Sequence, residues 1–380
     1  MKTPLTPLAG QTPRLGLVIC AGRFINSGVR PSGSQRRLCL PGAIAGTGGT
    51  LASMDAVADD RPTVVFLGVP SSAGAHHAGQ DLAPGVLRSR GFVDRLVAAG
   101  LNVEDRGDVG GEVFVVDHGH PTQRNMSAVV RVARGVADEV EQVRRDGALA
   151  LVLGGDCTIT LGVLAGVQRV DPTAGVLYFD GDADLGAPER TRSGILDATG
   201  VAHLLGIADN PLSHLGERYP MLDDSQLVML GFDETDPDAF DGSVFTQRPR
   251  LRHFADHVLR ADPSGVARQA VTAISGVAGS VIVHFDVDAV DSGDLPLGNF
   301  PHYGTGVDLS AAGATLRVLC SAPNLAAIVL TEINPSHDPD GTQLDRYIDT
   351  VSAALGTALG GSPRQQAPDG PSNDRNALPG

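Results

Sequence analysis

Three aspartates stand at alternate positions just after an apolar run, in the stretch LYFDGDADLG at residues 177–186. They are Asp180, Asp182 and Asp184. Alternate residues of an extended chain point to the same face, so this stretch would hold three carboxylates close together. Such crowding costs free energy unless a cation neutralises the carboxylates or one of them keeps its proton. Cation binding is therefore the first chemistry that the sequence suggests.

Other acidic groups and one thiol follow apolar runs in the same way. They are Asp156, Cys157, Asp286, Asp288, Asp291 and Glu332. The carboxyl ends of the strands of an open α/β sheet are where ligands bind. Ordinary helix capping explains Asp156, which precedes TITLGVLAG as an N-cap would. Capping explains the others less well, because unpaired buried carboxylates are costly, and metal binding is the favoured interpretation.

Six short apolar runs rich in β-branched residues predict the strands that must position these groups. They are residues 63–68, 149–155, 175–180, 226–232, 280–286 and 325–332. Segments with helical spacing lie between several of them, most clearly at residues 127–147. Near-continuous apolar strands separated by helices predict an α/β fold whose parallel sheet is covered on both faces.

The composition limits the classes of protein to which the chain could belong. The 380 residues are 42% hydrophobic and 19% charged, with no apolar run long enough to span a bilayer, which is a globular profile. The net charge of −15 argues against nucleic acid or an anionic membrane as a partner, because their phosphates would be repelled. Four irregularly spaced cysteines fit a reducing cytoplasm better than a disulfide scaffold.

The two ends of the chain differ from its middle. Residues 1–61 and 359–380 are rich in glycine, proline and polar residues and lack a sustained hydrophobic period. We expect a disordered extension and a disordered tail there. Residues 62–358 are then the single folded domain.

Four blocks, in this order along the chain, resemble the signature blocks of the ureohydrolases, the family of arginase and agmatinase. They are VLGGDCT (152–158), FDGDADL (179–185), HFDVDAVD (284–291) and TEINP (331–335). Similar segments lie outside the blocks, and the resemblance covers roughly residues 62–356. These segments are GVPSSAG (68–74), APGVLR (83–88), LGFDETDP (230–237) and NPSHDPDGTQLD (334–345). The resemblance implies three α/β/α layers around a mainly parallel sheet, and a homo-oligomer that is a trimer or a hexamer.

The resemblance also implies a chemistry for the acidic residues. Family members hold two Mn²⁺ ions, and the hydroxide that bridges the ions attacks the guanidinium carbon of a small-molecule substrate to release urea. Glu332 would face that guanidinium group, and Ser193 would help to bind the substrate. Carried over position by position, the metal ligands are Cys157, Asp180, Asp182, Asp184, Asp286 and Asp288.

The chain departs from the family pattern at the histidines. The family motif GGDH reads GGDC here, so Cys157 replaces one histidine ligand, and D-x-H-x-D reads DGDAD, so Asp182 replaces another. Oxygen ligands favour Mg²⁺, Ca²⁺ or Mn²⁺, whereas a thiolate favours softer ions such as Zn²⁺. The ligand set is mixed, so the metal stays open between Mn²⁺, Mg²⁺ and Zn²⁺.

A further departure lies in SGILDA, residues 193–198, where the family has Ser-Gly-Asn-Leu-His-Gly. Ile195 replaces the asparagine that helps to hold an amino-acid substrate, which argues against arginine as the substrate. Asp197 replaces the histidine that shuttles a proton, and a carboxyl group with a raised pKa is able to act there as a general acid.

Cys157 has a rival interpretation as a nucleophile. A nucleophilic thiol needs a nearby base, and only the fold could bring His203 or His284 to it. A lone cysteine in a core is commoner than a catalytic one, so the nucleophile interpretation is not favoured.

The sequence leaves three functions open. The first is a metal-dependent hydrolase of a non-peptide C–N bond in a linear amidine or guanidino compound other than arginine. The second is a pseudoenzyme that keeps the fold and acts as a binding or regulatory subunit, and the third is another reaction such as amide deacylation. Five acidic residues retained in the blocks favour the hydrolase, because a dead site would be free to lose buried acids that destabilise it. They are Asp180, Asp184, Asp286, Asp288 and Glu332.

Overall fold

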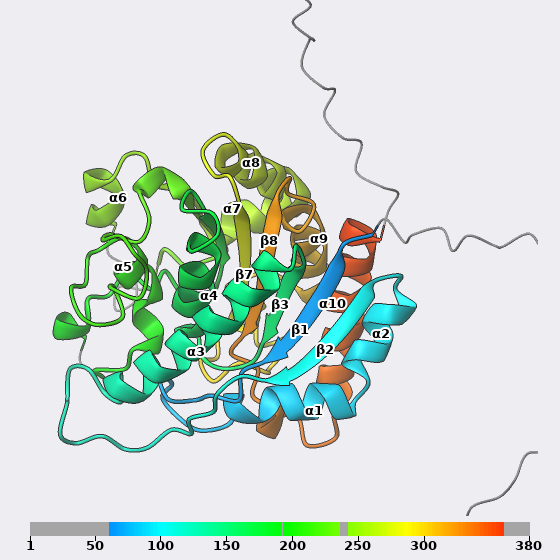
Figure 1. Ribbon diagram of the computed structural model, residues 1–380, viewed down its shortest axis with the longest axis horizontal. Helices are drawn as coiled ribbons and strands as arrows, with labels where there is room; N and C mark the ends of the chain where they lie inside the picture. The colour runs from blue at the N-terminus through cyan, green and yellow to red at the C-terminus, as the bar shows by residue number, and fades with distance from the viewer. Residues whose placement is uncertain (1–60, 192, 236–241, 361–380) are drawn as a thin grey trace, which may run out of the picture. The chain divides into compact units, whose positions relative to one another are not determined.

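The computed structural model of the chain describes residues 61–191, 193–235 and 242–360 (Figure 1). The predicted extension at residues 1–61 and the predicted tail at residues 359–380 lie almost wholly outside these ranges. Among the described residues, no helix is both long enough and apolar enough to cross a membrane.

The described residues form one parallel sheet with the strand order β2-β1-β3-β8-β7-β4-β5-β6. Its strands are β1 (Thr63–Gly68), β2 (Asn102–Asp108), β3 (Leu149–Leu153), β4 (Gly175–Phe179), β5 (Leu227–Leu230), β6 (Arg252–Phe254), β7 (Val281–Asp286) and β8 (Leu325–Thr331). All six predicted strands are confirmed. The two edge strands β2 and β6 were not predicted, because their sequences NVEDRGD and RHF are polar and partly exposed.

Helices cover both faces of the sheet, so the three-layer α/β/α fold is confirmed (Figure 1). Five helices pack on one face: α1 (Ala83–Ser89), α2 (Phe92–Ala98), α8 (Pro263–Ser275), α9 (Leu309–Leu319) and α10 (Thr342–Leu359). Three pack on the other: α3 (Met126–Arg145), α4 (Ile159–Gln168) and α5 (Gly200–Leu204). Two short helices, α6 (Ser243–Gln247) and α7 (Asp256–Ala261), follow β5 and β6. The helix predicted at residues 127–147 is α3.

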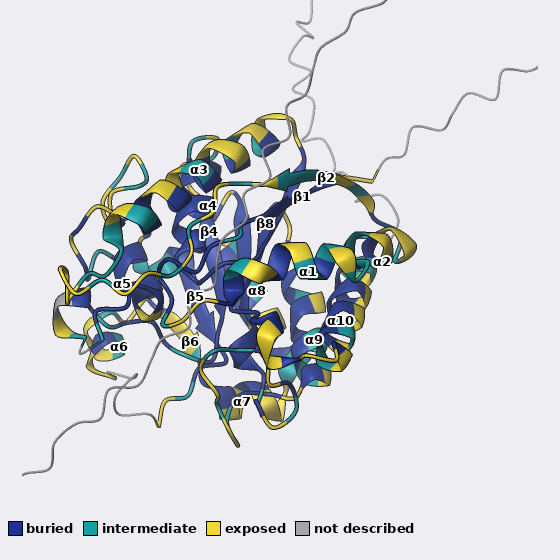
Figure 2. Ribbon diagram, turned by 90° about the horizontal axis from the view of Figure 1, so that it is seen from below, coloured by how far each residue is buried: buried dark blue, intermediate teal, exposed yellow. Residues whose placement is uncertain are grey.

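The strands are buried on both sides, and alternation of residues along each strand supplies two separate apolar clusters (Figure 2). On β7, Val283 and Phe285 belong to the cluster under α8, α9 and α10, whereas Ile282 belongs to the cluster under α3 and α4. The same alternation places His284 and Asp286 on the α3 and α4 side of β7. The face of a strand that builds the core therefore also decides where its polar residues point.

Unusual backbone conformations gather at the carboxyl ends of three central strands. Gly154 and Gly155 after β3 have φ of +97° and +83°, which lets the chain turn sharply before Cys157. Asp184 after β4 and Glu332 after β8 have φ of +49° and +64°, which side chains other than glycine seldom adopt. Backbone strain of this kind concentrates at functional sites.

We expect Phe285→Ala to lower the free energy of unfolding by about 3–5 kcal/mol, because it empties a fully packed position. The Phe285 ring stacks on Phe179 at 5.0 Å and lies 6.2 Å from the Tyr347 ring. Urea unfolding followed by circular dichroism measures the change. Val115→Ala, at a side chain that is 65% exposed, is the control and should change stability by less than about 0.5 kcal/mol. Equal midpoints for the two variants would contradict this account of the core.

Candidate metal centre

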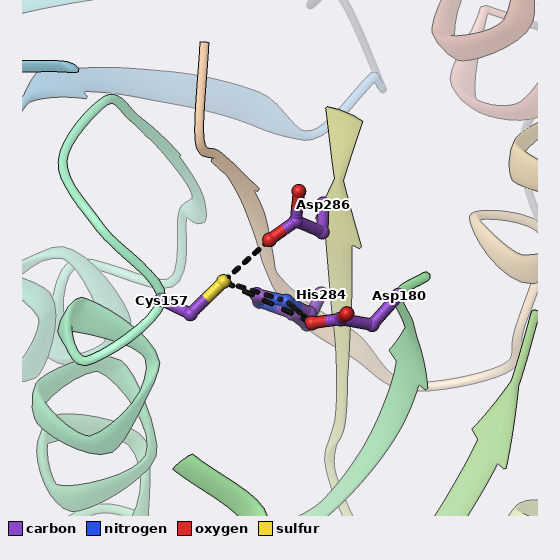
Figure 3. A group of neighbouring side chains, drawn as sticks. All are labelled: Cys157, Asp180, His284 and Asp286. Atoms are coloured by element: carbon purple, nitrogen blue, oxygen red, sulfur yellow. Dashed lines mark hydrogen bonds and ion pairs between the residues drawn. The ribbon is translucent and has the colours of Figure 1, made fainter. Parts of the chain in front are cut away.

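Four buried side chains converge beyond the carboxyl ends of β3, β4 and β7: Cys157, Asp180, His284 and Asp286, which we call the thiol cluster (Figure 3). The Cys157 Sγ lies 2.6 Å from Asp286 Oδ2 and 3.6 Å from His284 Nε2. Asp180 Oδ2 lies 3.3 Å from the same His284 nitrogen. Three of the predicted metal ligands therefore meet, together with a histidine that was not predicted as a ligand.

The strand period and the register of the sheet explain this convergence. His284 and Asp286 are two residues apart on β7, and Tyr178 and Asp180 have the same spacing around the end of β4. The β4–β7 register pairs Tyr178 with His284, and their rings stack at 4.0 Å. Thr160 in the first turn of α4 has its Oγ1 2.8 Å from His284 Nδ1. These contacts turn His284 Nε2 toward the thiol and the carboxylates.

A second group, the histidine–aspartate cluster, consists of Asp182, Asp288 and His302. The His302 Nε2 lies 3.6 Å from Asp182 Oδ2 and 3.9 Å from Asp288 Oδ2. This nitrogen is buried and makes no hydrogen bond within the described part of the chain, because both oxygens lie beyond hydrogen-bonding distance. The backbone of Ser292 holds the histidine segment, with the Ser292 N–H donating to His302 O at 2.7 Å.

Asp197 and Glu332 form a third group with Cys157, in which the thiol sulfur and one oxygen of each carboxylate lie within 4.8 Å of one another. The Cys157 N–H donates to Asp197 Oδ1 at 2.8 Å and to Glu332 Oε1 at 3.2 Å. Burial, followed by neighbouring negative charge, raises the pKa of both carboxyl groups. Gln80 Nε2 donates to Glu332 Oε2 at 2.8 Å. The two residues predicted as catalytic are thus direct neighbours.

Two predicted site residues lie outside the clusters among the described residues. Asp184 is buried and accepts a hydrogen bond of 2.7 Å from the Tyr178 hydroxyl. Ser193 is half-buried, and its Oγ accepts a hydrogen bond of 3.3 Å from Ile195 N–H. The Ile195 side chain is 3% exposed, so this stretch presents little polar surface to the cluster.

Burial and mutual repulsion favour the protonated forms of the acidic groups in the thiol cluster. Burial, followed by the charge of Asp288, raises the pKa of both Asp180 and Asp286 well above the ordinary range. Burial and then Asp286 and Asp180 raise the pKa of the Cys157 thiol. A bound cation would remove this penalty, because metal ligands bind as thiolate and carboxylate.

The two histidines near the clusters differ in charge. Burial lowers the pKa of His284 to about 3, so its imidazole is neutral near pH 7. Burial alone would also lower the pKa of His302, but Asp182 and Asp288 raise it to about 9. Near pH 7 His302 is therefore a cation that offsets part of the negative charge beside it.

The donor atoms fit a divalent metal ion. In each cluster one ligand atom per residue lies within 4.8 Å of the others, and the atoms are thiol sulfur, imidazole nitrogen and carboxylate oxygen. These are the atom types that bind Zn²⁺ and Mn²⁺. His302 Nε2 is a ligand atom only in the neutral imidazole, so a metal ion bound there would displace the proton that it carries near pH 7.

The structure brings His284 to Cys157 but favours no nucleophilic thiol. A reactive cysteine needs a lowered pKa, and four acidic neighbours raise that of Cys157 instead. His203, the other base considered, is bonded to Thr199 O at 2.7 Å and to Asn210 Nδ2 at 2.8 Å.

The N-cap prediction for Asp156 was wrong. The N-cap of α4 is Thr158, and Asp156 instead accepts hydrogen bonds from Thr158 N–H and, at 2.9 Å, from Gly74 N–H. It fastens the segment after β1 to the segment after β3.

Sequence reasoning missed His302 and Gln80, which contact the site, and it considered His284 as a base for the thiol but not as a metal ligand. His284 carried a signal, because it stands two residues before Asp286 and had to share its face. No pattern pointed to His302 and Gln80, because they lie in a loop and in a short 3₁₀ helix, far along the chain from Asp182 and Glu332. Only the fold brings them in.

The fold and the clusters define a parallel α/β protein with a candidate metal centre at the carboxyl edge of its sheet. The chain belongs to the arginase family, whose sequence model matches residues 62–356. The predicted resemblance to the ureohydrolases is thereby confirmed.

Individual relatives agree with this assignment. The arginase of Brevibacillus brevis is 29% identical over 301 residues, which cover 77% of this chain and 98% of that protein. The crystal structure of arginase from Bacillus cereus has a TM-score of 0.69 at 25% identity, covering 80% of this chain and 99% of that one. A formimidoylglutamase from Bacillus subtilis has the same fold, with a TM-score of 0.61 at 18% identity over 80% of this chain and 87% of that one.

We expect Asp288→Asn to stabilise the metal-free protein above pH 6. Burial and Asp182 raise the pKa of Asp288 from 3.8 to about 6. The stability that this raised pKa provides is fully present below about pH 4 and is lost as the pH rises through 6, because the buried group must then ionise. The amide never ionises, so the variant should gain on the order of 1–3 kcal/mol over the wild type at pH 8.

Urea unfolding with a chelator present, at intervals between pH 4 and 8, measures this gain. The control is Glu139→Gln, at an exposed residue of α3, which should leave the difference from the wild type constant with pH. Equal stability of the Asp288 variant and the wild type at pH 8 would contradict the predicted electrostatic penalty.

Proposed function

We propose that the chain is a divalent-metal-dependent hydrolase of a non-peptide C–N bond in a linear amidine or guanidino compound. The observation that carries this proposal is that Cys157 meets both Asp180 and Asp286 and the Asp197–Glu332 pair, whose carboxylates accept hydrogen bonds from the Cys157 N–H. Metal-binding donors and a proton-holding pair are the two components that metal-assisted hydrolysis needs. Membership of the arginase family supports the reaction class.

Two groups of residues would hold metal. Cys157, Asp180 and Asp286 would hold one ion, and Asp182 and Asp288 would hold a second. Asp184 stays part of the proposed ligand set, in an orientation held by the Tyr178 hydroxyl. A bound divalent ion supplies an activated water and stabilises negative charge at the reacting carbon. Mn²⁺ is the ion that the family resemblance favours, with Mg²⁺ and Zn²⁺ as alternatives.

Glu332 and Asp197 would handle the substrate and the proton. Burial, followed by Asp197, raises the pKa of Glu332, and burial, followed by Asp156, raises that of Asp197. These raised pKa values favour a proton on one of the pair, and the leaving amine requires a proton. Once ionised, the Glu332 carboxylate would accept hydrogen bonds from an amidinium or guanidinium group, and Gln80 holds it in place.

The proposed substrate is a small molecule other than arginine. The buried Ile195 offers no hydrogen bond to an amino-acid carboxylate, while Ser193 beside it would contact the polar part of the substrate. The proposal includes a homo-oligomer, a trimer or a hexamer, that works in the cytoplasm.

A second candidate function is a pseudoenzyme that serves as a binding or regulatory subunit. The observation that favours it is the internal neutralisation of the site. Protons on the thiol cluster and the charged His302 offset the carboxylates, so the fold is able to tolerate the site without an ion. Such a chain would bind no metal and release no product.

We expect Glu332→Gln to lower turnover at least about 100-fold. The amide has no negative charge to pair with a guanidinium or amidinium group, and it cannot exchange a proton. Its metal content should remain that of the wild type. Release of urea or ammonia from a panel of guanidino and amidine compounds gives the first readout, and elemental mass spectrometry gives the second. Glu217→Gln, at an exposed position, is the control. A wild-type chain without metal and without product would support the pseudoenzyme instead.

A further inference from the structure

We propose that His284 supplies the imidazole ligand that the family motif has at position 157, so that the thiol cluster is a four-ligand site selective for Zn²⁺ over Mn²⁺. The site consists of one thiolate, one imidazole and two carboxylates, from Cys157, His284, Asp180 and Asp286. This inference rests on the proposed function, because it concerns the same metal centre, but its readouts are independent of turnover.

The spacing of the ligand atoms supports a tetrahedral site. With zinc bonds of about 2.0–2.3 Å, the ligand atoms of a tetrahedron are about 3.3–3.6 Å apart. Cys157 Sγ to His284 Nε2 is 3.6 Å, and His284 Nε2 to Asp180 Oδ2 is 3.3 Å. Cys157 Sγ to Asp180 Oδ2 is 3.8 Å. Three of the edges that these four atoms define therefore lie at or near the required length.

The remaining contact of the thiol is shorter than the edge of a tetrahedral site. Cys157 Sγ and Asp286 Oδ2 are 2.6 Å apart, with the thiol proton directed at the carboxylate. A cation that replaces this proton would separate the two atoms by binding between them. Metal binding and loss of the thiol proton are the same event at this position.

The orientation of His284 is set before any metal binds. Thr160 Oγ1 holds Nδ1 at 2.8 Å, and the Tyr178 ring stacks on the imidazole at 4.0 Å. The histidine side chain is completely buried, and the neighbours of its Nε2 are the Cys157 sulfur and an Asp180 oxygen. A hydroxyl or carbonyl on the second nitrogen is the usual support of a metal-binding histidine. Thr160 is therefore a positioning residue.

The donor set explains the expected selectivity. Thiolate and imidazole suit Zn²⁺, whereas Mn²⁺ and Mg²⁺ favour sites of carboxylate and water oxygens. For a given set of donors, Zn²⁺ also binds more tightly than Mn²⁺ in the usual order of stability. A thiolate in place of the motif histidine, with an imidazole retained from β7, shifts the site toward zinc.

Cobalt is the probe, because Co²⁺ occupies zinc sites and reports its ligands by absorption. The full chain is stripped of metal with a chelator and titrated with Co²⁺. We expect a thiolate-to-cobalt charge-transfer band in the near ultraviolet, together with the intense visible bands of four-coordinate cobalt. Zn²⁺ should abolish both, and Mn²⁺ at the same concentration should not.

Variants assign the band to its ligands. Cys157→Ser should remove the charge-transfer band, and Cys320→Ala, at a second buried thiol on the far side of the sheet, should keep it. His284→Ala should lose most of the Co²⁺ affinity, while His118→Ala, at an exposed histidine, should not. Thr160→Val should keep the band but weaken Zn²⁺ binding about 10–100-fold.

A double variant tests whether the imidazole ligand has moved from position 157 to position 284. Its expected result is a change in metal preference and not a loss of metal binding. Cys157→His alone places a second imidazole against His284 and should bind metal poorly. Cys157→His with His284→Ala makes room for the motif histidine. We expect the double variant to bind Co²⁺ without a charge-transfer band and to prefer Mn²⁺ more than the wild type does. Circular dichroism of each metal-free variant checks that it is folded.

Three results would overturn the inference. Metal binding by the wild type with Mn²⁺ preferred and no charge-transfer band would remove the thiolate site but leave the hydrolase standing. If the wild type binds no ion under any condition, both the thiolate site and the proposed hydrolase function are ruled out. Rapid alkylation of Cys157 by iodoacetamide, with turnover that survives metal removal and is lost on alkylation, would make the thiol a nucleophile instead.

Discussion

Repulsion among buried carboxylates at the carboxyl edge of the sheet is the constraint on which the rest of the site depends. Asp180 and Asp286 are buried within reach of one another's charge, and so is Asp288. Backbone N–H groups offset part of the repulsion, since Asp182 N–H donates to Asp180 at 2.7 Å and Asp288 N–H donates to Asp286 at 2.8 Å. Protons and His302 offset more. The site therefore stabilises positive charge, whether a proton, the imidazolium of His302 or a metal ion supplies it.

The apolar core of the sheet offsets the free-energy cost of these buried carboxylates. Its central strands are buried on both sides by two apolar clusters, and stabilisation there offsets strained and charged residues at one edge. Strain is local, since Asp184 and Glu332 adopt left-handed backbone conformations directly beside the clusters. Stability and chemistry are thus separated along each strand: apolar residues along its length, and ionisable residues where it ends.

Cys157 and His284 show how a site keeps a donor type while its position in the chain changes. The motif position that carries histidine in the family carries cysteine here, and an imidazole from β7 occupies the neighbouring space. The second motif position carries Asp182, and His302 approaches it from the segment before α9. At both positions a histidine lost from the local pattern has a histidine beside it in space.

The amino-acid pattern by itself determined the parallel sheet, its six inner strands and the acidic edge, because apolar period and strand ends are local properties of the chain. It also predicted that Asp197 and Glu332 belong to the site, through their motif positions. The hydrophobic pattern did not predict the polar edge strands β2 and β6, because hydrogen bonding to the neighbouring strand and not burial stabilises them. Only the tertiary structure brought His302 and Gln80 to the carboxylates, since contacts between segments that are distant along the chain leave no periodic trace in a sequence.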